Sequence, residues 1–228
     1  MSDGSIDNDR TPPSGRLGPL VRRNVHRGGA LLILGAVQFI VAMIVVQFEY
    51  PGYTDFGNYI SDLGGSHSPW AWLFNISIRV LGILGILALI LIRTAFPDRS
   101  SARVGLGFLG LTVIGAFLVG SYPEGSPYGL HGIFSDLTFI SAALGLLIIS
   151  FAMLRDTRWV GFRFYTFLSG LVTAVAIILF SYGLVGPLGV GGMERLIVAP
   201  ILLWAILVGV HLLNLPTYAP GIRRSVST

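Results

Sequence analysis

The sequence predicts an all-α integral membrane protein, a bundle of six transmembrane helices. Of its 228 residues, 53% are hydrophobic and only 11% are charged, whereas a soluble domain carries about a quarter charged residues. Six apolar stretches are each long enough to cross a hydrocarbon core, which takes about 20 helical residues. The arginines gather in alternate polar segments, as expected when a chain crosses a membrane repeatedly.

The apolar stretches cover residues 29–48, 70–92, 104–121, 131–153, 164–184 and 196–213. The first is full span length and follows a long polar arm, so we expect a retained anchor rather than a cleaved signal peptide. We expect three parts: a cytoplasmic arm over 1–24, a six-helix domain over 25–214 and a cytoplasmic tail over 215–228. The arm is polar and rich in Pro, Ser and Gly, which predicts disorder.

The charge distribution predicts the topology. All 15 basic residues are arginines, and 13 of them lie on the side of the two termini. By the positive-inside rule, both termini are expected in the cytoplasm and the protein in the plasma membrane. The net charge of +4 then reflects topology and attraction to anionic lipid, not nucleic-acid binding. The lack of cysteine excludes disulfides and cysteine-ligated metals.

The first outer connection, residues 49–69, is the longest and predicts a short helix at the membrane surface. Its apolar residues recur at helical spacing and a Gly-Gly pair follows them. Asp55, Asn58 and Asp62 are spaced i, i+3, i+7 and would share the opposite face. A solvated face is the simplest interpretation of these three, and a binding surface is the alternative.

Arg79 lies inside the second apolar stretch, one turn after Asn75. A charge at membrane depth needs a partner, water or a function. The surrounding aliphatic residues outweigh the cost of inserting arginine, about 2.5 to 3.5 kcal/mol, so insertion does not explain why it is there. Two interpretations stay open: a buried pair with Asp136 or Asp62, and a contact with a ligand.

Polar residues also mark the outer ends of the fourth and sixth stretches. His131 and Ser135 share a face at i, i+4, with Asp136 beside them and Glu124 in the preceding loop. Glu194 and Arg195 open the sixth stretch, where an acid also complements a helix N-terminus. The full set of candidate ligand-binding residues is Asn58, Ser61, Asp62, Asn75, Arg79, Glu124, His131, Ser135, Asp136, Glu194 and Arg195.

Metal binding and hydrolysis are the catalytic interpretations of this set. Asp62, Glu124, His131 and Asp136 could converge, yet one well-placed histidine is fewer than most zinc sites use. Ser135 and His131 suggest a nucleophile and a base, but neighbours on one helix seldom have the required orientation. We therefore expect no metal and no cofactor.

The ordered motifs resemble a known family. Residues 58–64 read Asn-Tyr-Ile-Ser-Asp-Leu-Gly, and they are followed by Phe74-Asn75, by Tyr122-Pro123-Glu124 with His131, and by Glu194-Arg195 with Trp204. This set resembles the prokaryotic membrane family called domain of unknown function 998, from about residue 28 to 214. It is distantly similar to the eukaryotic six-helix group of DRAM autophagy modulators and Sfk-type proteins, a group associated with lipid remodelling and membrane asymmetry. This similarity implies a shared fold rather than a shared activity. The resemblance points to Asn58, Ser61, Asp62, Asn75, Glu124, His131 and Glu194.

The functional hypothesis is a module that binds or moves a lipid-like or small amphiphilic ligand through an outward-facing polar pocket, with Arg79 at its floor. One alternative is a membrane-embedded hydrolase or transferase that uses Asp62, His131 and Asp136, with or without a metal. Another is a structural membrane subunit. The expected partners are membrane lipids and a small amphiphile. The sequence does not indicate an oligomeric state.

Overall fold

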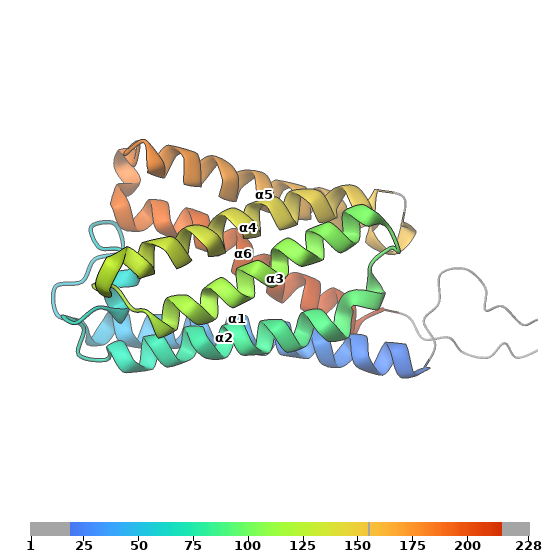
Figure 1. Ribbon diagram of the computed structural model, residues 1–228, viewed down its shortest axis with the longest axis horizontal. Coiled ribbons are helices and arrows are strands. Elements are labelled where there is room, and N and C mark those ends of the chain that lie inside the picture. Colours follow the sequence, from blue (N-terminus) through green and yellow to red (C-terminus); the bar gives the residue numbers. More distant parts are fainter. Residues whose placement is uncertain (1–18, 155, 216–228) are drawn as a thin grey trace, which may run out of the picture.

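The computed structural model describes residues 19–154 and 156–215, and these residues form six long helices (Figure 1). The helices are α1 (Pro19–Glu49), α2 (Ala71–Ile92), α3 (Ser100–Ser121), α4 (Leu130–Met153), α5 (Val160–Ser181) and α6 (Gly189–Leu213). Five 3₁₀ turns join them: η1 (Ser61–Gly64), η2 (Arg93–Ala95), η3 (Pro127–Gly129), η4 (Thr157–Trp159) and η5 (Gly186–Leu188). Each long helix is apolar and long enough to cross a membrane. The predicted all-α, six-span architecture is confirmed.

The helices form a ring in chain order. Each packs against the helix before and after it, and α1 closes the ring by packing against α6. Figure 1 shows that α1 begins and α6 ends at one end of the bundle, here called the terminal end. The opposite end, called the distal end, carries the connections 50–70, 122–129 and 182–188. All predicted outer motifs therefore lie at the distal end.

Small residues let neighbouring helices approach closely. A Cβ on Gly115 of α3 would collide with Thr138 of α4, and Gly29 and Gly209 face each other's backbone between α1 and α6. Such close contacts drive helix association in lipid, where burial of apolar surface gives little advantage. At the terminal end, the fully buried Trp159 stacks on Phe96 at 4.7 Å and donates to the Ala95 carbonyl. The ring is thus tightly packed at its terminal end.

Three boundaries differ from the sequence expectations. Residues 19–24, expected in the arm, begin α1 because Val21 packs on the core and Val25 is fully buried; residues 1–18 and 216–228 lie outside the described part. The short helix expected in the first connection is only the turn η1, since Pro51, Gly52 and Gly57 interrupt the segment before it. α6 begins at Gly189, so Glu194 and Arg195 lie in its second turn rather than at its start.

Candidate functional site

Arg195 attaches the first connection to α6. Its guanidinium donates to the Asp55 carboxylate and backbone carbonyl, both at 2.7 Å, and to the Tyr53 hydroxyl at 2.9 Å. It also donates to the Gly191 carbonyl and the Gln47 amide oxygen. Burial raises the pKa of Tyr53, and Arg195 offsets part of that rise. Arg195 therefore has a structural role, and it does not face a ligand cavity.

Glycines at the start of α6 allow the loop backbone to lie against the helix. The Gly191 amide donates to the Phe56 carbonyl at 3.0 Å. A Cβ on Gly191 would clash with the Asn58 carbonyl, and one on Gly189 would clash with Phe56. Gly189 also has a φ of +62°, which side chains rarely adopt. This glycine-rich sequence lets the loop backbone lie directly against the first turn of the helix.

Glu194 holds the turn η1 in place. Its carboxylate accepts a hydrogen bond from the Ile60 backbone amide at 2.5 Å, and the side chain is buried, with the residue 8% exposed. Ile60 and Leu63 are buried on either side of this bond. The bond brings Ser61 to the middle of the distal end, where it faces the interior of the ring.

Three other candidates stabilise the same loop by bonding to its backbone. The Asp62 carboxylate accepts from the Tyr59 amide at 2.9 Å, and the Asn58 side chain accepts from the Thr54 amide at 3.1 Å. Asn75 of α2 donates to the Gly64 carbonyl at 2.9 Å. Such side-chain bonds to nearby backbone groups are typical of turns. None of the three lines either cavity described below, so their role is to shape the loop.

The expected pair between Arg79 and Asp136 or Asp62 is absent, since the ion pairs found within residues 19–154 and 156–215 do not include Arg79. Its Nε donates to the Asn75 carbonyl, one turn back toward the distal end. Its aliphatic stem lies against Gly120 of α3. Helical arginines extend toward the helix N-terminus, which lets the charge reach the interface. In the ring α3 lies between α2 and α4, which separates Arg79 from Asp136, and Arg79 lines neither of the two spaces described below.

His131 is held between two oxygen acceptors. Its Nδ1 lies 3.0 Å from the Tyr122 carbonyl oxygen, and its Nε2 lies 3.2 Å from the Glu124 carboxylate. A carbonyl only accepts, so Nδ1 carries a hydrogen. The His131 side chain is 12% exposed and that of Glu124 is 47% exposed. The pair fixes the loop between α3 and α4 while His131 faces inward.

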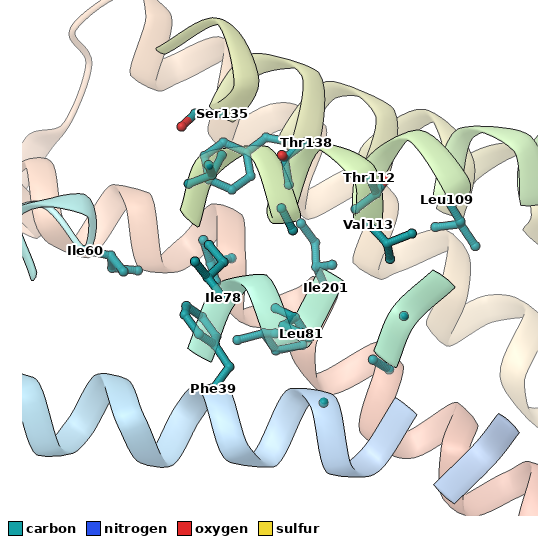
Figure 2. Close-up of a pocket in the computed structure, with 18 of the residues that line it drawn as sticks. Phe39, Ile60, Ile78, Leu81, Leu109, Thr112, Val113, Ser135, Thr138 and Ile201 are labelled. Carbon is teal, nitrogen blue, oxygen red and sulfur yellow. The ribbon is translucent and has the colours of Figure 1, made fainter. Parts of the chain in front are cut away.

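An apolar cavity of about 130 Å³ lies inside the ring. Residues of α1, α2, α3, α4 and α6 line it, and α5 contributes none. Figure 2 shows Phe39, Ile78 and Ile201 from three of these helices pointing into the space. The polar residues at its distal end include Ser61, His131, Ser135 and Glu194. The cavity is therefore a hydrocarbon-lined chamber with a polar mouth.

A second, more polar cleft of about 340 Å³ lies between α4 and α5 at the distal end. Its lining includes Glu124, Asp136 and Ser181, together with the aromatic residues Tyr59 and Phe180. α4 and α5 pack closely nearer the terminal end, where Gly170 lies against Leu146 and Leu147. Figure 1 shows the two helices diverging toward the distal end. This divergence creates the cleft.

The cleft and the cavity lie side by side, since five residues line both. They are Ser61, His131, Ser135, Phe139 and Glu194. Six of the predicted site residues therefore meet here: these four polar residues together with Glu124 and Asp136. The other five, Asn58, Asp62, Asn75, Arg79 and Arg195, line neither space.

Sequence reasoning missed the apolar half of the site. Phe39, Leu81 and Ile201 line the cavity, whereas Leu203 of the same helix as Ile201 is 50% exposed on the outer surface. Both environments are hydrocarbon-like, so residue type does not separate them. Thr112 and Thr138 are the residues that could have indicated which side of α3 and α4 faces the cavity, since polar residues within a span tend to face the bundle interior.

The geometry does not assemble the catalytic groups considered from the sequence. Within the part of the chain that the structure describes, no three His, Asp or Glu side chains lie close enough to hold a metal ion. His131 directs its nitrogens at Tyr122 and Glu124, and not at Ser135. Asp62 bonds to the Tyr59 amide outside the cleft, so it does not join His131 and Asp136.

Comparison with known proteins identifies the family. Residues 33–211 match the model of a protein family of unknown function, DUF998. The chain belongs to the DUF998 family. It is a multi-pass membrane protein of that family, with six helices that can span the bilayer. No curated protein and no solved structure matches it.

Proposed function

We propose that this protein binds one lipid-like amphiphile, with its polar head in the cleft and its hydrocarbon chain in the cavity. The observation that carries the proposal is the shared rim of five residues, which puts a polar space directly beside an apolar space. An apolar cavity that opens on a few convergent polar groups is the usual form of a ligand site. Neither half alone would favour an amphiphile over a water-soluble or a purely apolar molecule.

The length of the cavity supports a hydrocarbon chain as the occupant, and its volume limits how much of the chain it holds. Along α6 the cavity extends from Glu194 to Ala205, which is about 16 Å at the helical rise of about 1.5 Å per residue. One leaflet is about half of a hydrocarbon core of about 30 Å, so the two lengths agree. The volume of about 130 Å³ is below the roughly 300 Å³ at which drug-sized pockets begin. A dry cavity of about 150 Å³ holds a benzene-sized molecule, so this space takes part of one hydrocarbon chain and not two.

The distribution of arginines supports a site at the outer surface. Thirteen of the 15 arginines lie on the side of the termini, which by the positive-inside rule is cytoplasmic. We infer that the distal end faces outward in the plasma membrane. Because the cleft lies between two membrane-spanning helices, an amphiphile can reach it sideways from the outer leaflet.

Filling the cavity tests the proposal. Ile201→Phe adds volume inside the ring, and Leu203→Phe makes the same kind of change on the outer face of the same helix. Native mass spectrometry of the full chain, purified in mild detergent with a lauroyl lysolipid added, would measure occupancy. We expect Ile201→Phe to weaken binding at least about tenfold, which corresponds to about 1.4 kcal/mol, and Leu203→Phe to leave it unchanged.

Absence of amphiphile binding would contradict the proposal. If the wild-type protein retains no amphiphile and the two variants behave alike in a folded state, the cavity is not a ligand site. The polar residues would then act only in holding the helices and loops together, as in the structural-subunit hypothesis.

A further inference from the structure

The cleft is acidic in a chain that is basic overall. Its lining includes the carboxylates of Glu124, Asp136 and Glu194 but no arginine, although the chain has a net charge of +4. Asp136 is exposed to the cleft and forms no hydrogen bond or ion pair with the described residues. Glu124 is paired with His131, so the carboxylates that the cleft leaves for a ligand are those of Asp136 and Glu194.

The two arginines of the distal half point away from the cleft. Arg195 directs its guanidinium at Asp55, Tyr53 and neighbouring acceptors of the first connection. Arg79 lies along the contact between α2 and α3. An anionic head group would thus meet carboxylates without a compensating arginine, and like charges at close range repel.

Glu194 lies where the cleft meets the cavity. It is 8% exposed, lines both spaces and forms no ion pair in residues 19–154 or 156–215. A backbone hydrogen bond from Ile60 is a weak substitute for a counter-ion around a buried carboxylate. A positive charge on a bound ligand would supply the missing counter-ion.

Aromatic rings complete the lining of the cleft. Tyr59, Phe139 and Phe180 all contribute, and the rings of Tyr59 and Phe180 meet edge to face at 6.0 Å. Aromatic faces attract ammonium groups through the ring quadrupole, and several rings around a cation are the common way to recognise quaternary ammonium. Carboxylates and aromatic rings together therefore favour a positively charged nitrogen over an anion.

We infer that the amphiphile bound by this protein has a head group with a positively charged nitrogen. The ammonium lies between Asp136 and Glu194, against the rings of Tyr59 and Phe180, while the chain enters the cavity. This inference rests on the proposed function and adds the chemical class of its ligand. A zwitterionic phospholipid head and a simple cationic amphiphile share this chemistry.

Three probes with the same chain length separate the head groups. Lauroyl lysophosphatidylethanolamine carries an ammonium and a phosphate, lauroyl lysophosphatidylglycerol carries only the phosphate, and dodecyltrimethylammonium carries only the ammonium. Each would be titrated into the full chain in a neutral detergent, with occupancy read by native mass spectrometry. We expect the ethanolamine lysolipid to bind about tenfold more tightly than the glycerol lysolipid, a difference of about 1.4 kcal/mol. Binding of dodecyltrimethylammonium would show that a free cationic amphiphile suffices, and its failure to bind would restrict the ligand to zwitterionic lipids.

Charge-neutralising variants locate the preference. Asp136→Asn and Glu194→Gln should each reduce the ratio of the two lysolipid affinities several-fold, and the amide oxygen introduced by the second change can still accept from Ile60. Glu49→Gln is the matched control, because Glu49 is an exposed acid at the distal end that lines neither space. The inference is overturned if the glycerol lysolipid binds as tightly as the ethanolamine one, or if the preference persists in both variants. In that case, loss of all lysolipid binding in Ile201→Phe would show that the proposed function still holds. If the wild-type protein bound none of the probes specifically, both the proposed function and this inference would be wrong.

Discussion

Arg195 and Asp55 are joined by two hydrogen bonds of 2.7 Å although they are 140 residues apart in the chain. One guanidinium nitrogen donates to the Asp55 carbonyl and the other to its carboxylate. The planar fork of arginine matches this pair of acceptors, which a lysine ammonium cannot do. The contact fixes the first connection across the start of α6, and so places Tyr59 and Ser61 at the cleft.

Replacing this arginine by lysine should loosen the loop without removing its charge. Arg195→Lys loses several charge-assisted hydrogen bonds, each worth about 1.5 to 3 kcal/mol when fully buried; because Asp55 is half exposed, we expect a net loss of about 1 to 2 kcal/mol. Thermal unfolding in detergent would show a lower midpoint. Arg93→Lys, at an exposed position, is the control. Equal midpoints for both variants would show that the fork does not hold the loop.

Arg79 should be dispensable for ligand binding. Its guanidinium bonds only to the Asn75 carbonyl within the described residues, and it lines neither cavity. Arg79→Leu removes the cost of inserting a charge, so the unfolding midpoint should stay the same or rise. Lysolipid affinity should change less than about twofold, a difference of about 0.4 kcal/mol, whereas His131→Ala in the shared rim should weaken it markedly. If a folded Arg79→Leu protein loses the lysolipid, the arginine contacts the ligand after all.

The contrast between Arg79 and His131 shows how far the sequence could lead. The length of the apolar stretches predicted the six spans. The positions of the acids and His131 next to those spans predicted that they gather at the distal end. The partner of Arg79 depended on which helices are neighbours. A ring in chain order puts α3 between α2 and α4, and hydropathy carries no information about that order.

The apolar cavity was unpredictable for a different reason. Ile201 lines the cavity and Leu203 faces outward, yet both are aliphatic residues in one helix. In a soluble protein, polarity would distinguish inside from outside, but in a bilayer both sides of the helix are apolar. The rotational position of each helix is set by packing contacts such as Gly29 against Gly209.

The link between α4 and α5 should be sensitive to acid. Burial alone would raise the pKa of Asp156, but hydrogen bonds and charge from Arg158, with help from Arg99, lower it below its ordinary value of 3.8. The unfolded chain therefore binds this proton at a higher pH than the folded chain does. The contribution of the Asp156 carboxylate to folding stability is complete above about pH 4 and is lost as the pH falls through the folded pKa. Asp156→Asn should be less stable than wild type at neutral pH and should lose less stability on acidification. Asp98→Asn, at an exposed acid of the same end, should keep the wild-type profile, and an identical profile for Asp156→Asn would contradict the prediction.

Trp204 should report the presence of a chain in the cavity. It is 3% exposed, lines the cavity and donates to the Thr166 hydroxyl at 3.0 Å. Trp70 and Trp72 are exposed at the distal end, so both are replaced by Phe to remove quenching from the surrounding lipid. Trp159, fully buried at the terminal end, then contributes a constant background. An amphiphile brominated near the end of its chain should quench the Trp204 part of the emission in proportion to occupancy. Adding Ile201→Phe should abolish the quenching, and quenching that survives this change would come from outside the ring.

Access between α4 and α5 can be tested because the chain contains no cysteine. Ile140 and Ile177 line the cleft from opposite helices, so Ile140→Cys with Ile177→Cys allows a reducible bifunctional reagent to tie the two helices together. The matched control is Phe151→Cys with Phe167→Cys, where the two rings already meet at 6.2 Å. We expect the cross-link at the cleft to slow release of the brominated amphiphile about tenfold, which is about 1.4 kcal/mol in the barrier. Reduction should restore the original rate, and the control cross-link should leave it unchanged. Release that stays fast with the cleft tied shut would mean that the amphiphile leaves through the distal loops, past the pair formed by Glu124 and His131.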